Sequence, residues 1–142
     1  MITQTLTRSF LLELFQGVHV LPTDQLRMAL YRSVATLGPE TTAYTADGEA
    51  VGTGYTARGL ALQNVSIVGA STGAFVTFDN PSFAPGSYFA DGALIFNASK
   101  ADRAIAVLSF GGTKIADPTR SFVVTLPPAQ ISTALLRLQI NS

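Results

Sequence analysis

Only one histidine, His19, could act as a general base or a metal ligand in this chain. The acids nearest to it in the sequence are Glu13 and Asp24. Catalysis or metal binding needs further groups held at a fixed geometry, and the sequence around His19, GVHV, offers none. We therefore expect His19 to be a packed residue, or one that compensates the C-terminal end of a helix.

Other motifs that carry chemistry are absent or incomplete. Ser71 lies in a G-x-S-x-G sequence, Gly69–Gly73, a pattern that presents the nucleophile of many hydrolases, but the chain's single histidine precedes it, whereas in those enzymes the histidine follows the serine. The glycines at Gly52, Gly54 and Gly59 are spaced differently from those of a dinucleotide-binding loop. Asp47 and Glu49 would supply only two of the roughly six to eight oxygens that calcium takes. We expect no catalytic residue, no cofactor and no metal site, so the chain is predicted not to be an enzyme.

Charge is scarce in this chain of 142 residues. Nine Lys and Arg balance nine Asp and Glu, and charged residues make up 13% of the sequence, about half the usual ~25%. The mean hydropathy is +0.33. Because a net charge near zero favours association, we expect an oligomer or a part of a larger assembly. The alternative is an unusually apolar monomer.

The same composition speaks against several partners and sites. Nucleic-acid binding needs clustered Lys and Arg, whereas here the cations are scattered. No run of about 18 apolar residues exists to span a membrane. The chain has no cysteine, which rules out disulfides and cysteine-based sites. We expect neither nucleic acid nor a membrane as a partner, and we do not interpret the N-terminus as a signal peptide.

The stretch Asp91–Phe110 is predicted to organise the rest of the fold. It contains two apolar segments, Ala93–Phe96 and Ala104–Phe110, joined by a polar turn. Such a hairpin is apolar on both faces and needs cover on both. One cover is expected to be an opposing sheet, and the other is either the N-terminal helix or a neighbouring subunit.

The N-terminal part predicts an extended arm, a short helix and a strand. Residues 1–8 lack breakers and suit an arm, and the helix follows up to Gly17. In that helix Leu11, Leu14, Phe15 and Val18 recur with helical spacing, which predicts that this face packs onto the core or onto a neighbouring subunit. The segment Gln25–Arg32 alternates, which indicates a strand with one wet or interfacial face.

The segment Val34–Arg58 is predicted to be a long loop that lies on a partner, because few of its side chains could anchor a core. A strand is expected from Leu60 to Ile67, with room for a bulge near Gln63 and Asn64. Further short strands are expected in Ala74–Phe78, in Phe122–Leu126 and in Leu135–Ile140, and Gly111–Thr119 is expected to form a turn. Many short strands with frequent turn signals predict a single all-β domain over residues 1–142, a β-sandwich or jelly-roll-like fold with one short N-terminal helix.

Most of the chain, from about Ser9 to Leu138, resembles a family of small virion-associated proteins of tailed bacteriophages. The resemblance rests on five segments: SFLLELFQGVHV, DQLRMALYRSVATLG, TTAYTADGEAVGTGYTARGLAL, ADGALIFNASKADRAIAVLSFGGTK and FVVTLPP. Arg58 and Gly112 depart from the family pattern, at positions where a small and an acidic residue respectively would be usual.

This resemblance implies a capsid cement, or decoration, protein. Such proteins are small β domains that form homotrimers and clamp neighbouring major capsid proteins, so the expected location is the capsid surface of a virion made in the bacterial cytoplasm. The candidate assembly contacts come from the arm, the helix and the loop: Ile2, Leu6, Leu11, Phe15, Tyr44, Tyr55 and Arg58.

Two other functions are open at this point. A neck, tail or baseplate component would use the same β domain in a ring or tube. A glycan- or receptor-binding module would present exposed aromatic side chains on its loops, for which the candidates are Tyr44, Tyr55, Phe83 and Tyr88.

Overall fold

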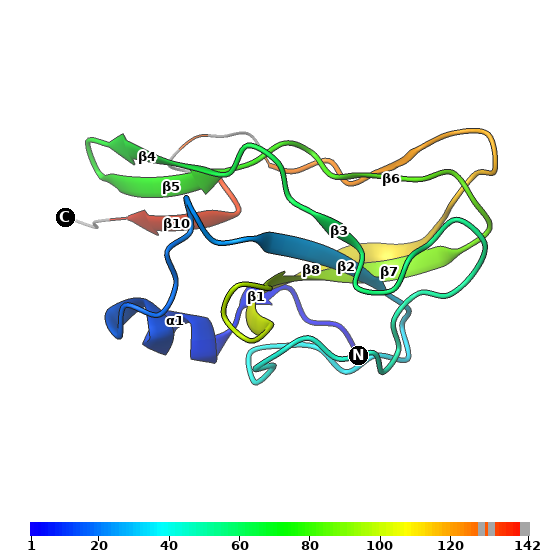
Figure 1. The fold of residues 1–142 in the computed structure, drawn as a ribbon, viewed down its shortest axis with the longest axis horizontal. Coiled ribbons are helices and arrows are strands. Elements are labelled where there is room, and N and C mark those ends of the chain that lie inside the picture. The colour runs from blue at the N-terminus through cyan, green and yellow to red at the C-terminus, as the bar shows by residue number, and fades with distance from the viewer. Residues whose placement is uncertain (128–129, 131–132, 140–142) are drawn as a thin grey trace.

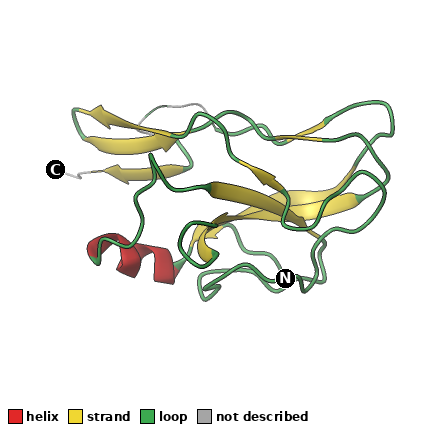
Figure 2. Ribbon diagram, in the orientation of Figure 1, coloured by secondary structure: helices red, strands yellow, loops and turns green. Residues whose placement is uncertain are grey.

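A computed structural model of the chain describes residues 1–127, 130 and 133–139. It confirms an all-β fold with one short helix, α1 (Arg8–Phe15), which Figure 2 shows in red. The strands are β1 (Thr5–Leu6), β2 (Leu26–Tyr31), β3 (Leu60–Ala61), β4 (Ser66–Ala70), β5 (Gly73–Thr77), β6 (Ser82–Phe83), β7 (Phe89–Asn97), β8 (Arg103–Ile115), β9 (Phe122–Val123) and β10 (Leu136–Gln139).

The predicted hairpin forms the centre of the largest sheet. β7 and β8 pair in antiparallel register within a five-stranded sheet of order β1-β8-β7-β2-β3. Both strands run further than the sequence predicted. The turn predicted at Gly111–Thr119 is wrong over its first half, because β8 continues to Ile115. Gly111 and Gly112 lie in an irregular part of the β7–β8 pairing, opposite Asp91, where the register shifts. Irregularities of this kind bend a strand without ending it.

Two smaller sheets form a second layer along one side of the central sheet (Figure 1). Their orders are β10-β5-β4 and β6-β9. The single strand predicted from Leu60 to Ile67 is wrong, because the chain turns at Asn64, where φ is 56°, and enters a different sheet. The strand predicted over Phe122–Leu126 is shorter, and that over Leu135–Ile140 ends at Gln139, with Ile140 outside the described residues.

The first face of the hairpin lies in the main apolar core. Ile95 and Ile105 pack there with Leu26, Met28 and Leu30 of β2, all fully buried. The same cluster includes residues of the smaller sheets, among them Phe83 of β6 and Leu136 of β10. It also includes Phe10 of α1, and Val124, which follows β9. This face is therefore covered by the opposing sheets, as the sequence predicted, with the helix at one end.

The second face is covered by the segment that was predicted to lack core anchors. Ala35, Leu37 and Tyr44 from this loop pack on a separate cluster of Ala29, Tyr31, Leu94, Phe96, Ala104 and Val107. The loop lies along the far side of the central sheet from the smaller sheets (Figure 1). Two predictions are therefore wrong: β2 has no wet face, since Ala29 and Tyr31 are fully buried, and the hairpin needs neither the helix nor a neighbour as its second cover.

The N-terminal arm is extended, and it lies on the chain's own sheet. β1 pairs with β8, the Met1 ammonium donates to the Ala35 carbonyl at 2.9 Å, and Ile2 forms a bridge to Leu37. Ile2 also packs against the second cluster. The arm therefore ties the covering loop to the edge of the central sheet.

Because both faces of the hairpin are covered, truncation on either face is expected to be costly. Leu94→Ala on the loop-covered face and Ile95→Ala on the main-core face should each lower the free energy of unfolding by about 2–5 kcal/mol. Urea denaturation measures both, with the exposed Ile115→Ala as a control that changes little. A Leu94→Ala variant as stable as this control would contradict the second cover.

Candidate functional site

An open apolar groove of about 140 Å³ lies between α1 and the three-stranded sheet. Leu6, Phe10, Leu14 and Leu21 line one side, and Ile67, Ala74, Phe75, Val76, Leu136, Arg137 and Leu138 line the other. Figure 1 shows α1 and this sheet at the same end of the molecule. Arg137 is the only charged residue in the lining, so the groove suits apolar side chains of a partner.

Exposed apolar side chains continue from the groove onto both of its rims. On the helix side, Phe15 is 94% exposed and Leu11 is 40% exposed; on the sheet side, Leu138 is 61% and Ile67 52% exposed. On a helix, positions 11, 14 and 15 form one stripe, so Leu14 in the groove leads outward to the other two. This arrangement is an unpartnered apolar surface, a feature typical of interaction sites.

The helical stripe exists, and its predicted packing onto the core holds only in part, since Leu14 packs against the main core cluster. Phe10 and Glu13 are the buried residues of α1, while Leu11 and Phe15 face outward. Thr7 caps the helix by accepting a hydrogen bond from the Phe10 amide, and Gly17 follows its end with φ at 70°, so the predicted boundaries hold within two residues.

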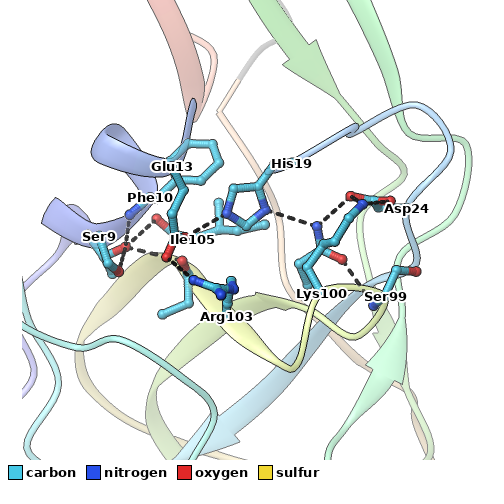
Figure 3. A network of polar contacts seen from close by, with 12 residues as sticks. Ser9, Phe10, Glu13, His19, Asp24, Ser99, Lys100, Arg103 and Ile105 are labelled. Atoms are coloured by element: carbon cyan, nitrogen blue, oxygen red, sulfur yellow. Dashed lines mark hydrogen bonds and ion pairs between the residues drawn. The ribbon is translucent and has the colours of Figure 1, made fainter. Parts of the chain in front are cut away.

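A buried ion-pair and hydrogen-bond network explains why Glu13 faces inward (Figure 3). Its carboxylate accepts from His19 Nε2 and from Arg103 Nη1, each at 2.8 Å. A buried carboxylate without partners would be strongly destabilising, and these two donors remove that cost. Phe10 packs edge-on against the His19 ring. The network therefore fixes the rotation of α1 and leaves part of its apolar stripe outside.

The network continues through Asn97 to the hairpin tip. The Asn97 amide donates to His19 Nδ1 at 2.9 Å and to Asp24 Oδ2 at 2.7 Å. Lys100 completes it with an ion pair to Asp24 at 2.8 Å. Burial of the Asp24 carboxyl raises its pKa, but the hydrogen bonds from Lys100 and Asn97 lower it. Together they hold the pKa of Asp24 below its usual value.

His19 is the packed residue that the sequence predicted. Its side chain is 0% exposed. Because the Asn97 Nδ2 atom can only donate, the ring accepts at Nδ1 and donates from Nε2 to Glu13. Both ring nitrogens are thus occupied inside the protein, and this histidine serves packing and helix placement.

A second polar cluster closes the covering loop around Glu49, which is 4% exposed. Its carboxylate accepts from the hydroxyls of Tyr44 at 2.5 Å and Tyr55 at 2.6 Å, and from the amide of Arg58 at 2.7 Å. Tyr55 in turn accepts from the Leu30 amide of β2 at 3.0 Å. Burial and the hydrogen bond to Glu49 raise the pKa of Tyr44 to about 12. The cluster therefore anchors the loop to the central sheet.

Arg58 adds an ion pair to this cluster. Its guanidinium meets both carboxylate oxygens of Asp102 and lies over the rings of Tyr44 and Phe96, about 5.2 and 5.3 Å from their centroids. The hydrogen bond from Arg58 holds the pKa of Asp102 below its usual value. Arg58 therefore links the loop to the turn of the central hairpin.

The seven predicted assembly contacts fall into three places. Leu6 lines the groove, and Leu11 and Phe15 lie on its rim. Ile2 packs under the covering loop. The other three, Tyr44, Tyr55 and Arg58, converge on Glu49 and hold the loop to its own sheet. Among the described residues, Leu11 and Phe15 therefore have no polar anchor within the chain's own core. Arg58, by contrast, is held by Asp102, though its side chain is 41% exposed.

Sequence reasoning missed the sheet side of the groove and Glu49. Leu138 alternates with polar neighbours and Ile67 lies beside Val68 in a short apolar run, and both patterns also occur in ordinary core strands. In the sequence, Glu49 stands out only as an incomplete calcium ligand beside Asp47. A buried acid that binds three donors has no sequence signal beyond nearby tyrosines.

Comparisons with protein-family models, with curated proteins and with solved structures found no match to this chain. The resemblance to virion-associated proteins therefore stays a prediction. None of the helices in the described residues has the length and hydropathy to span a membrane. Among the same residues, no three His, Cys, Asp or Glu side chains gather as a metal site would require.

Removing the charge of Glu49 should destabilise the protein. In Glu49→Gln an amide nitrogen replaces one acceptor oxygen, so one of the three donors loses its partner, at a cost of about 1–3 kcal/mol. Thermal or urea denaturation measures this loss. Asp47→Asn, an exposed change two residues away, is the matched control, and equal stability of the two variants would contradict the anchoring role.

The Arg58–Asp102 pair should make stability depend on pH. Because the folded-state pKa of Asp102 is lowered, its stabilisation is complete above the unfolded value of about 3.9 and is lost as the pH falls through the folded value. Asp102→Asn should therefore cost about 0.5–1 kcal/mol near pH 7, and the difference from wild type should shrink below about pH 4.

Asparagine also suits the backbone at this position, where φ is 58°, because it tolerates the left-handed region. Denaturation curves at several pH values test the prediction. A difference between wild type and Asp102→Asn that stays constant down to pH 2 would show that the ion pair is not its cause.

Proposed function

We propose that the protein is a non-enzymatic structural subunit of a phage virion, a capsid cement protein that binds neighbouring major capsid proteins from the capsid surface. The observation that carries the proposal is the apolar groove between α1 and the three-stranded sheet, with exposed apolar side chains on both rims. In a chain with 13% charged residues, this surface is built for contact with protein.

The energetics fit a subunit that binds in many copies. Burying a large apolar side chain such as Phe15 contributes roughly 1.5–3 kcal/mol, so one groove and its rims give a contact of modest strength. Identical contacts repeated over a homotrimer on a capsid lattice add by avidity. Stable decoration therefore needs no large interface on any single copy.

The β-sandwich or jelly-roll-like architecture belongs to this proposal. Its support is that the main core draws residues from the five-stranded sheet and from the smaller sheets that lie along it. Two layers packed in this way make a rigid body, and the groove lies at one end of it, where it can reach a capsid while the rest of the domain stays outside.

The geometry supports a glycan-binding module less well. Phe83 and Tyr88 are buried and pack in an aromatic cluster with Phe122, and the hydroxyls of Tyr44 and Tyr55 bind Glu49. None of the four aromatics considered for sugar stacking forms an exposed platform. A neck or tail component differs from cement in copy number, since cement scales with the capsid subunits whereas a neck forms one ring.

Capsids of the phage that encodes this chain test the proposal. The double variant Leu11→Ser, Phe15→Ser should bind capsids at least tenfold more weakly in a co-sedimentation assay, because the helix-side rim loses its apolar contacts. Both residues are exposed, so the unfolding midpoint should change little. Ile115→Ser, also exposed but on β8, is the control. Wild-type affinity of the double variant would refute the assignment of the groove.

A further inference from the structure

β4 is an edge strand whose outer side has no partner in the described chain. It pairs only with β5, at the end of the order β10-β5-β4. All five of its residues are exposed, and Figure 1 shows it at the outer margin of its layer. An open edge of this kind presents unpaired amide and carbonyl groups that another strand can bind.

The usual protections of an edge strand are absent from β4. Proteins block exposed edges with charged side chains, proline, bulges or a covering segment. From Gly59 to Phe78 the sequence has no charged residue and no proline, and the β4–β5 register runs from Ser66 to Ala70 without a shift. As far as the described residues extend, β4 therefore stays open for pairing along its whole length.

The turn after β4 determines which of its backbone groups face outward. A two-residue turn, Ser71–Thr72, joins β4 to β5, so Ala70 and Gly73 are the hydrogen-bonded closing pair. Hydrogen-bonded and non-hydrogen-bonded pairs then alternate along the ladder. The amides and carbonyls of Ile67 and Gly69 accordingly point away from β5.

Nothing in the described part of the chain requires a glycine at position 69. Its φ is not in the left-handed region, and a Cβ at this position would meet nothing within 4 Å. Glycine inside a strand is destabilising, and it often marks a place where a ligand or another backbone approaches closely. The glycine at position 69 thus indicates that the backbone of another chain lies close to it.

We propose that β4 pairs in antiparallel fashion with β4 of a second copy of this chain, about a two-fold axis at Val68. In this register Ile67 of each copy lies opposite Gly69 of the other. The outward backbone amides and carbonyls of these two residues then form four hydrogen bonds between the copies. The Ile67 side chain of one copy lies beside Gly69 of the other, which has no side chain to clash with it. The two copies then share one continuous six-stranded sheet, β10-β5-β4 followed by its symmetry mate.

A second copy fits this edge better than an unrelated strand because the outward groups match themselves under two-fold symmetry. Isologous contacts of this kind are the commonest route to homodimers. The pairing goes beyond the proposed function, since it does not involve the capsid. A threefold trimer would use other surfaces, and β4 pairing would then link copies of adjacent trimers.

Single cysteines give a direct test because the chain contains none. At a two-fold axis the Cα atoms of residue 68 would lie about 4.5 Å apart, as in a non-hydrogen-bonded pair, which a disulfide can bridge. Val68→Cys should therefore cross-link into dimers under mild oxidation. In Ser66→Cys, the matched control in the same strand and on the same face, the thiols would lie about 13 Å apart and should not cross-link.

Two results would overturn the proposal: equal cross-linking of both cysteine variants, or none with either. Light scattering supplies a second test. Gly69→Lys should lower the mass measured for wild type to that of the species without β4 pairing, a monomer or a trimer, because the side chain occupies the space opposite Ile67. Ser82→Lys adds the same charge at an exposed residue of β6 and should leave the mass unchanged. An unchanged mass of folded Gly69→Lys would also contradict the pairing, and its capsid binding reports separately on the proposed function.

Discussion

The fold depends on the burial of one hairpin that is apolar on both faces. Leu94 and Phe96 on one side and Ile95 and Ile105 on the other are all fully buried, and exposing either set would cost several kcal/mol. The rest of the chain supplies the two covers: the smaller sheets over one face, and the loop with the N-terminal arm over the other. The central sheet is therefore complete within one chain.

The sequence predicted the hairpin, the helix and the all-β class because these follow from apolar periodicity. It did not predict the second cover, since Ala35 and Leu37 are small or isolated and show no period. What holds that loop in place is polar: the Glu49 carboxylate with its tyrosine and amide donors. Such a contact joins residues that are close only after folding, so no local pattern reports it.

The helix shows a different limit of pattern reasoning. Its apolar stripe is real, but periodicity alone does not tell which face of an amphipathic helix is buried. Here Glu13 decides the rotation of α1, because its carboxylate accepts hydrogen bonds from His19 and Arg103 inside the protein. These two charge-assisted bonds contribute more than burial of the Phe15 side chain would. Leu11 and Phe15 of the stripe are consequently left at the surface, while Leu14 packs against the core.

The scarce charges follow the same logic. Glu13, Asp24, Glu49 and the Arg58–Asp102 pair are all engaged in holding segments of the chain together, which leaves few to keep the surface hydrated. The lack of surface charge is greatest at one end of the molecule, at the three-stranded sheet. The groove, its apolar rims and the uncharged edge of β4 all belong to this sheet or border it. Exposed apolar surface with little charge is thus concentrated on and beside this small sheet, and the central hairpin is the rigid support that presents it.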